Sequence, residues 1–280
     1  MNKYFECGRY RFPMVGEQYK PLVMGILNVT PDSFSDGGQF QTLDSAISHA
    51  EQMIRDGVDI IDIGGESSRP GAITVPLEEE LRRIVPLIYA LRDCGKPLSI
   101  DTYKPEVMRE SILAGADMIN DIQGFRTVEA RNVVAESDVG LCIMHMQNKP
   151  SDMQLKPQYE NVNVEILNFV RQRLSELELA GVARERICVD PGFGFGKTLK
   201  HNISLMRNIR QYQNETGVPL LVGVSRKSMI GEITGRPVEQ RMAGSLAAAL
   251  VALSQGAKIL RVHDVAETVD GIKVWQALSI

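Results

Sequence analysis

Residues 58–66, Val-Asp-Ile-Ile-Asp-Ile-Gly-Gly-Glu, show the pattern that decides the fold of this 280-residue chain: a short apolar run that ends on polar residues. Seven further runs repeat it, at residues 22–27, 97–100, 117–119, 139–144, 186–189, 218–224 and 258–260. Continuous Val, Ile and Leu runs are typical of parallel strands, because helices cover both faces of the sheet. The eight runs therefore predict a parallel sheet with polar residues gathered at one edge.

Helical spacing of apolar residues follows most of these runs. We expect helices from a cap at Thr42 to Gly57, from Pro76 to before Gly95 with a kink at Pro86, from Pro105 to Gly115, and over 160–180, 202–213, 241–254 (well buried) and 265–278. Strands that alternate with helices predict right-handed crossovers. Eight such units would close a (β/α)8 TIM barrel, whose active site lies at the carboxyl ends of the strands. A doubly wound open sheet is the alternative.

Composition narrows the class of protein further. No linker or low-complexity tract divides the chain, so we expect one domain over 1–280, with residues 1–20 as an N-terminal extension. The net charge of −4 argues against a nucleic-acid partner. We expect no membrane partner, because no run approaches about 20 apolar residues. Residues 1–20 lack the apolar core of a secretory signal, and the four scattered cysteines predict reduced thiols in a cytoplasmic protein.

Two loops that follow the first two strands are candidate functional segments. Residues 28–38 form a long loop that opens with Asn28, and long loops at this end of a sheet are usually functional. Residues 64–71 combine three glycines with hydroxyls and Arg69, which are donors suited to an anionic group. Ordinary turn-rich loops are the alternative for both.

Three polar residues, Asp101, Asn120 and Asp190, follow the third, fourth and sixth strands. Each alone could cap the next helix. Together at a barrel mouth, they can accept hydrogen bonds from a planar heterocycle that is rich in N–H donors. A metal cage is a weaker reading, because no second histidine or carboxylate lies beside them at ligand spacing.

The glycine-rich segment 190–198 does not fit a phosphate loop, because that motif requires glycine where Pro191 stands. The dinucleotide pattern fails as well, since Lys197 replaces its last glycine. We expect instead a flexible loop that presents Phe193 or Phe195 to a ring.

Basic residues follow the last two strands, in Ser225-Arg226-Lys227-Ser228 and Arg261-Val262-His263. Barrels often bind phosphate at these two loops, so we expect an anion site, with a solvated basic patch as the alternative. His145 is equally consistent with a core histidine and with a ligand contact.

Four of these segments, 24–38, 62–71, 190–197 and 225–228, resemble the signatures of the dihydropteroate synthases. The resemblance runs from about residue 20 to residue 280. It implies a (β/α)8 barrel, usually a homodimer, that acts in bacterial folate synthesis with Mg²⁺. The reaction joins 6-hydroxymethyl-7,8-dihydropterin diphosphate to 4-aminobenzoate and releases pyrophosphate and 7,8-dihydropteroate.

The resemblance also implies roles for individual residues. The pterin ring would be held by Asp101, Asn120, Asp190 and Lys227, and its pocket lined by Met144 and Phe195. Asn28 would bind Mg²⁺ and the diphosphate, with Arg261 and His263 on the phosphates. The aminobenzoate site would comprise Ser68, Arg69, Pro70 and Ser228. One departure is visible, because Ser68 stands where the family usually has threonine, which affects the fit of aminobenzoate and of sulfonamide mimics.

A mechanism follows from these roles. Diphosphate leaves once Mg²⁺, Arg261 and His263 neutralise its charge. The remaining cation spreads into the dihydropterin ring, where Asp101 and Asp190 can stabilise it, so we expect cleavage before attack in an SN1-like order. Asp101, Asp190, Lys227 and Arg261 are thus the predicted catalytic residues. The alternatives are a pterin-binding methyltransferase domain that uses methyltetrahydrofolate, and an inactive barrel that serves as a scaffold.

Overall fold

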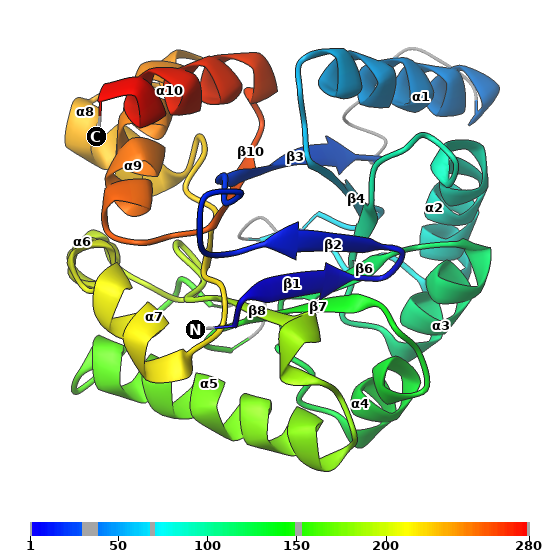
Figure 1. Ribbon diagram of the computed structural model, residues 1–280, viewed down its shortest axis with the longest axis horizontal. Helices are drawn as coiled ribbons and strands as arrows, with labels where there is room; N and C mark the ends of the chain where they lie inside the picture. Colours follow the sequence, from blue (N-terminus) through cyan, green and yellow to red (C-terminus); the bar gives the residue numbers. More distant parts are fainter. Residues whose placement is uncertain (1, 30–38, 68–70, 149–152, 279–280) are drawn as a thin grey trace.

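The computed structural model describes residues 2–29, 39–67, 71–148 and 153–278, except for the side chains of residues 39–42. Eight parallel strands form one sheet in the order β8-β7-β6-β5-β4-β3-β10-β9. A parallel bridge between Val189 and Leu220 joins the two ends of this sheet. The strands therefore close into a barrel, with the helices on its outside (Figure 1). The predicted (β/α)8 barrel is confirmed, and the open-sheet alternative is wrong.

Each predicted apolar run overlaps one barrel strand. The strands are β3 (Leu22–Asn28), β4 (Ile60–Gly64), β5 (Leu98–Asp101), β6 (Met118–Asp121), β7 (Gly140–Met144), β8 (Ile187–Asp190), β9 (Leu221–Val222) and β10 (Ile259–Val262). Strand β9 is much shorter than the predicted run 218–224. The polar residues named above lie at or just beyond the carboxyl ends of these strands, as the pattern predicts.

Ten α-helices are present among the described residues. They are α1 (Gln39–Arg55), α2 (Leu77–Leu91), α3 (Pro105–Ala114), α4 (Val128–Ala135), α5 (Val162–Leu179), α6 (Leu199–Arg207), α7 (Ile209–Thr216), α8 (Ser228–Thr234), α9 (Met242–Ser254) and α10 (Val265–Leu278). Short 3₁₀ helices cover Arg184–Arg186 and Val238–Gln240. Helix α3 begins on Pro105 and ends at Gly115, whose φ of 112° is left-handed, as predicted. None of these helices is long and apolar enough to cross a membrane.

Three helix predictions are wrong. Thr42 lies inside α1, which already begins at Gln39, so it is not the cap. The predicted helix 202–213 is two helices, α6 and α7, that meet at Asn208, where φ is −110° and ψ is 11°. Helix α9 is buried on one side only, because Ala249 and Ala252 are buried whereas Val251 is exposed. Helices α4 and α8 were not predicted, since both are short.

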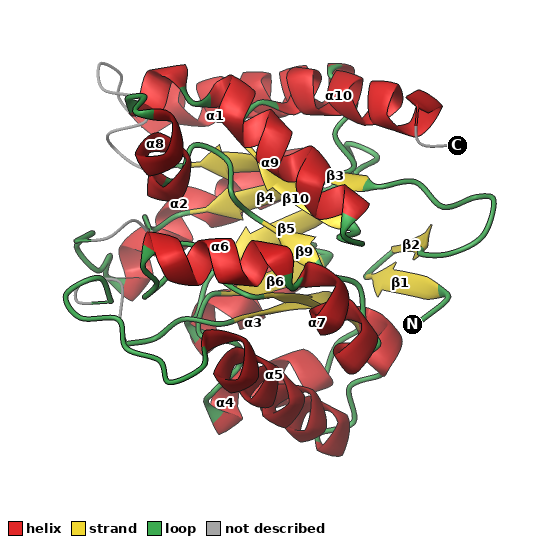
Figure 2. Ribbon diagram, turned by 90° about the vertical axis from the view of Figure 1, so that its left-hand side faces the viewer, coloured by secondary structure: helices red, strands yellow, loops and turns green. Residues whose placement is uncertain are grey.

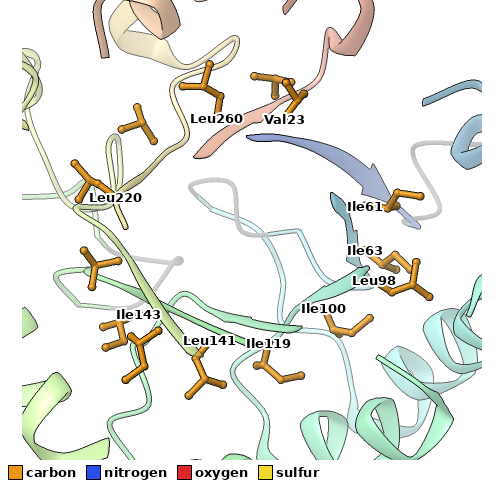
Figure 3. Packing of buried hydrophobic residues seen from close by; sticks show 14 of the residues in the cluster. Val23, Ile61, Ile63, Leu98, Ile100, Ile119, Leu141, Ile143, Leu220 and Leu260 are labelled. Atoms are coloured by element: carbon orange, nitrogen blue, oxygen red, sulfur yellow. The ribbon is translucent and has the colours of Figure 1, made fainter. Parts of the chain in front are cut away.

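The core has two layers, because successive residues of a strand point to opposite faces. Ile61, Ile63, Leu98 and Ile100 point outward from the ring of strands toward the helices (Figure 3). Residues that point inward at the amino-terminal half of the barrel form a second buried cluster, which includes Met24, Ile60, Met118, Cys142, Cys188, Leu221 and Ile259. The barrel is thus a packed core and not a channel.

The N-terminal extension forms an antiparallel hairpin of β1 (Tyr4–Cys7) and β2 (Tyr10–Pro13). Phe5 and Cys7 are fully buried in the inward-facing cluster, and Figure 2 shows the hairpin at one end of the barrel. Arg9, in the turn between the two strands, binds the buried carboxylate of Asp117 at 2.8 Å. The hairpin therefore closes the amino-terminal end of the barrel, which leaves the carboxyl-terminal end for a site.

Candidate active site

The carboxyl ends of three strands bring polar side chains together. Arg261 of β10 donates from one terminal nitrogen to Oδ2 of Asp101 on β5, at 2.8 Å. A Cβ atom on Gly223 would lie 3.6 Å from Cβ of Arg261 and 3.8 Å from Oδ2 of Asp190, so Asp190 is close to the same arginine. The predicted convergence of Asp101, Asp190 and Arg261 is therefore present in the structure.

A carboxylate beneath these groups was not singled out from the sequence. Asp62 on β4 is fully buried and accepts hydrogen bonds from Arg261 Nε at 2.6 Å and from Asn120 Nδ2 at 3.3 Å. Ser99 Oγ donates to its other oxygen at 2.6 Å. Asp62 thus connects Asn120 to Arg261 below the mouth of the barrel. The signal that could have found it is a charged residue within an otherwise apolar buried strand.

Lys227 lies over the aromatic side chain that faces the site. Its Nζ is 4.5 Å from the ring centroid of Phe195 and donates to the carbonyl of Phe193. Phe195 packs with Met144, Met146 and other residues in a small cluster, whereas Phe193 is fully buried in the main core. Of the two phenylalanines proposed from the sequence, the structure therefore places only Phe195 at the site.

The loop that carries Phe195 is fixed by polar contacts to its neighbours. Asp190 Oδ1 accepts from the backbone N–H of Gly192 at 2.7 Å. The buried ammonium of Lys197 donates to the carbonyls of Phe195 (2.9 Å) and His145 (3.3 Å) and lies 3.1 Å from His145 Nδ1. His145 is thus a buried histidine with a protein partner, the first of the two readings. The side chain of Lys197 therefore fixes the loop from inside the protein and is not the phosphate-binding lysine of a phosphate loop.

Gly192 shows why this loop requires glycine. Its φ is 73°, and a Cβ atom there would lie 1.9 Å from the carbonyl oxygen of His145. No side chain can occupy this position without moving β7 or the loop.

The site is electrostatically unusual because opposite charges are buried together. Burial raises the pKa of Asp101 to about 7, although Arg261 lowers it. Burial also raises the pKa of Asp190, which Lys227 lowers in part. Burial lowers the pKa of Lys227 to about 8, against the influence of Asp190. Burial lowers the pKa of Arg261, but Asp62 and Asp101 outweigh this effect and raise it overall. Perturbed groups of this kind gather at functional sites.

The predicted anion site is only partly assembled. Arg226 turns away from the pocket and pairs with Asp264 on the surface, so it is not part of the basic cluster expected from the sequence. His263 is held by Ser225, whose Oγ lies 3.0 Å from Nδ1 of the imidazole. Among the basic residues that were predicted there and that the structure describes, Lys227 and Arg261 face the pocket.

The other predicted residues have these positions. Asn28 is half-buried at the end of β3, and a Cβ atom on Gly64 would lie 3.4 Å from its Oδ1 and 3.7 Å from Cβ of Asp101. Met144 is buried at the end of β7, and Ser228 is exposed as the first residue of α8. Ser68, Arg69 and Pro70 lie outside the described residues, as does most of the loop 28–38.

A lysine that was not singled out from the sequence contacts Glu66 and Val75, on either side of a stretch that includes most of the second loop. Lys104 Nζ lies 2.7 Å from Glu66 Oε2 and 2.6 Å from the carbonyl oxygen of Val75. It also pairs with the buried Glu80 at 2.5 Å. Lys104 therefore holds Glu66 and Val75 close together.

These features define a (β/α)8-barrel enzyme with a buried polar pocket at the carboxyl ends of its strands. Residues 24–263 match the pterin binding enzyme family, and the chain belongs to that family. Its similarity extends further, to the dihydropteroate synthases. It is 49% identical over 265 residues to the dihydropteroate synthase of Neisseria meningitidis serogroup C. This alignment covers 93% of the present chain and 94% of the relative.

Solved structures agree with this relationship. The Burkholderia cenocepacia dihydropteroate synthase complexed with 7,8-dihydropteroate is 48% identical and superimposes with a TM-score of 0.88, over 99% of this chain and 96% of that one. The Xanthomonas albilineans dihydropteroate synthase with 4-aminobenzoic acid is 47% identical and superimposes with a TM-score of 0.91, over 100% of this chain and 99% of that one. The resemblance and the transferase function predicted from the sequence are confirmed, and the methyltransferase alternative is not favoured.

Proposed function

We propose that this chain catalyses the dihydropteroate synthase reaction, in which 6-hydroxymethyl-7,8-dihydropterin diphosphate and 4-aminobenzoate give 7,8-dihydropteroate and pyrophosphate. The observation that carries the proposal is the buried set of hydrogen-bond acceptors and cations at the carboxyl end of the barrel. The related Burkholderia enzyme binds 7,8-dihydropteroate and the Xanthomonas enzyme binds 4-aminobenzoic acid, which supports the same substrates here.

The pterin ring fits the chemistry of the pocket. One edge of a pterin presents an amine and ring N–H groups, which are donors for the oxygens of Asn120 and Asp190. Lys227 supplies a donor for the ring's acceptor atoms, and Phe195 and Met144 offer apolar surface against its face. Burial of this polar edge costs little free energy when each donor meets an acceptor, and much more when a donor is left without a hydrogen-bond partner.

The diphosphate would lie near Arg261, His263 and Asn28. Mg²⁺ takes oxygen ligands and usually keeps only one or two protein groups, with substrate phosphates and water as the rest. The side-chain oxygen of Asn28 fits such a role, and no cluster of three or more metal-binding side chains occurs in the described part of the chain. When bound, the ion would neutralise part of the charge on the leaving diphosphate. Arg261 would bind and orient the same group.

The carboxylates of Asp101 and Asp190 provide the negative charge that the reaction needs. Departure of diphosphate leaves positive charge on the dihydropterin methylene and ring, and buried carboxylates stabilise such charge more strongly than exposed ones. The neutral aniline nitrogen of 4-aminobenzoate is already a nucleophile, so no strong base is required. We propose that cleavage precedes attack, and that Ser68, Arg69, Pro70 and Ser228 bind the aminobenzoate.

Pyrophosphate release by the purified chain tests this proposal. With the pterin diphosphate and Mg²⁺, release should rise strongly when 4-aminobenzoate is added, and 7,8-dihydropteroate should accumulate in equal amount. The Asp190→Asn variant should keep its fold by circular dichroism and lose most of this release. A chain that releases no pyrophosphate but binds a reduced folate tightly would refute the proposal and favour the methyltransferase reading.

We propose further that the protein is a cytoplasmic homodimer. Free thiols suit a reducing compartment, and all four cysteines are free. Helices α8, α9 and α10 are neighbours in the fold (Figure 1). They expose large apolar side chains, among them Ile233, Val251 and Val274. Such surface is typical of a protein interface. Light scattering should give twice the mass of 31.0 kDa, and Val251→Lys should shift it toward the monomer; a monomeric wild type would contradict the proposal.

A further inference from the structure

Asp62 occupies the layer directly beneath the pocket. It lies in β4, between Ile26 of β3 and Ser99 of β5 in the register of the sheet. Its neighbours Ile61 and Ile63 point outward to the helices, so Asp62 points into the barrel (Figure 3). A fully buried carboxylate is costly unless several donors surround it.

Three donors from three different strands meet this carboxylate. Ser99 Oγ binds Oδ1 at 2.6 Å, and Arg261 Nε and Asn120 Nδ2 bind Oδ2 at 2.6 and 3.3 Å. Two of the three donors, Asn120 and Arg261, are residues to which we assign substrate contacts. Asp62 itself lies one layer deeper and is separated from the mouth of the barrel by them.

The contact with Asp62 determines which end of the Asn120 amide can face a ligand. An ionised carboxylate only accepts hydrogen bonds, so the amide must turn its NH₂ toward Asp62. The amide oxygen then becomes the group that is available to the pocket. Without this carboxylate, the amide could turn over and offer a donor instead. An amide oxygen is complementary to the N–H edge of a pterin, whereas an amide NH₂ would oppose it.

Arg261 is fixed in the same way. Its Nε is bound to Asp62 and one terminal nitrogen to Asp101, at 2.6 and 2.8 Å. A guanidinium held by two carboxylates from different strands has a defined plane and position. Loss of either carboxylate would free the side chain to move.

We propose that Asp62 is a positioning residue that makes the pocket specific for a donor-rich ring edge, because it holds Asn120 as an acceptor and Arg261 beside Asp101. The inference rests on the proposed function, since it concerns the ring that this pocket binds. It predicts that Asp62 controls the affinity for the pterin and not the affinity for 4-aminobenzoate.

A purely structural role for Asp62 is the competing explanation, and the chain contains a matched control. Asp59 is a buried carboxylate in the same β-strand region, where it accepts from Lys20 Nζ at 2.7 Å and from the backbone N–H of Val23 at 2.9 Å. None of these partners belongs to the pocket. The Asp59→Asn variant should therefore lower the stability while pterin binding stays as in the wild type.

The test is calorimetric titration of the wild-type chain and its variants with 6-hydroxymethyl-7,8-dihydropterin, which requires no turnover. Asp62→Ala should weaken binding roughly 10- to 100-fold, because Asn120 and Arg261, the two donors to which we assign substrate contacts, lose their acceptor. Asp62→Asn should lose less, since its amide can donate to Ser99 and still accept from Arg261. In steady-state assays, the KM for the pterin diphosphate should rise in both variants, and the KM for 4-aminobenzoate should not.

A double-mutant cycle shows whether Asp62 acts through Asn120. In an Asn120→Ala background, Asp62→Ala should cost clearly less pterin affinity than in the wild type. Three results would overturn the inference: unchanged pterin affinity in Asp62→Asn and Asp62→Ala, full additivity with Asn120→Ala, or an equal loss of pterin affinity in Asp59→Asn. If Asp62→Ala does not fold, the pterin affinity of Asp62→Asn alone decides. A wild-type chain that binds no pterin would instead reject the proposed function, and this inference with it.

Discussion

Replacing Lys227 by methionine should make the protein more stable while most of its activity is lost. The ammonium lies over the ring of Phe195 and donates to the carbonyl of Phe193. Burial is the main influence on its pKa, which falls from 10.5 to about 8 despite the nearby Asp190. Methionine has a similar length and can keep the contact with Phe195, but it carries no charge. The substitution therefore removes a buried charge with little loss of packing.

The size of the effect follows from the pKa. The change from 10.5 to about 8 corresponds to about 3 kcal/mol of unfavourable free energy at neutral pH. Lys227 is only half-buried as a whole, and the lost hydrogen bond to Phe193 costs about 1 kcal/mol. We expect a net gain of about 1–2 kcal/mol in the free energy of unfolding. Turnover should fall roughly 100-fold or more, because the variant lacks the cation that we propose binds the pterin.

The sign of the pH dependence provides an independent check. The pKa of Lys227 is lower in the folded than in the unfolded chain, so the folded chain binds fewer protons between about pH 8 and 10.5. Wild-type stability attributable to this lysine should therefore rise with pH through that window, by about 1–2 kcal/mol between pH 7 and 9.5. The methionine variant lacks this contribution, so its free energy of unfolding should exceed that of the wild type by less at pH 9.5 than at pH 7.

Urea denaturation at pH 7 and pH 9.5, together with steady-state kinetics, measures both effects. Lys200→Met is the matched control, because Lys200 is an exposed lysine on α6, and it should change neither stability nor turnover. A Lys227→Met variant that is less stable than the wild type at pH 7 would refute the reasoning on burial. A variant whose kcat/KM stays within a factor of about five would refute the role in the pocket.

Three further outcomes follow from the described contacts. Burial raises the pKa of Asp101 to about 7, so kcat/KM for the pterin diphosphate should fall as the pH drops below that value, and a pH–rate profile of Asp101→Asn should lack this limb; an unaltered limb would assign it elsewhere. Gly192→Ala should lower the free energy of unfolding by about 3 kcal/mol or more, since its Cβ would meet the carbonyl of His145, whereas Gly16→Ala, with positive φ but open space, should cost about 1 kcal/mol in the same denaturation assay. Equal losses would disprove the steric argument. Lys104→Met should lower it by about 3–5 kcal/mol, because the buried Glu80 and the half-buried Glu66 lose their partner, and a loss below 1 kcal/mol in urea denaturation would contradict this.

The barrel could be predicted from the sequence because its strands are apolar on both faces. A continuous run that ends on a polar residue locates the carboxyl end of each strand, and the chain direction of a parallel sheet brings these ends together. This is why Asp101, Asn120, Asp190 and Arg261 were expected in one place and are found there. Their roles toward substrates stay predictions.

The same property concealed Asp62. In a strand with one solvent-exposed face, the alternation of apolar and polar residues distinguishes inward-facing from outward-facing positions. A continuous apolar run contains no such signal. Ile61, Asp62 and Ile63 therefore give no indication of which of them faces the inside of the barrel. The contact of Asp62 with Arg261 joins residues 199 positions apart, and only the closed sheet brings them together.

Two other features escaped prediction for local reasons. The break between α6 and α7 falls at Asn208, with no proline or glycine to mark it, and the helical spacing of apolar residues continues across it. The strands of the N-terminal hairpin have four residues each, which is too short for a periodicity. Their burial comes from Phe5 and Cys7, which cover the inward-facing cluster of the barrel.

The charges of the pocket depend on one another, and this explains why it behaves as a unit. Burial alone would neutralise Asp101 and Asp190 by raising their pKa, and would neutralise Lys227 by lowering its pKa. Each group is shifted toward its charged form by its opposite: Arg261 lowers the pKa of Asp101, and Asp190 raises that of Lys227. Removal of one charge therefore weakens the charged state of its partner as well as deleting its own contact. Single substitutions here should cost more activity than the lost hydrogen bonds, and paired substitutions less than the sum of the two.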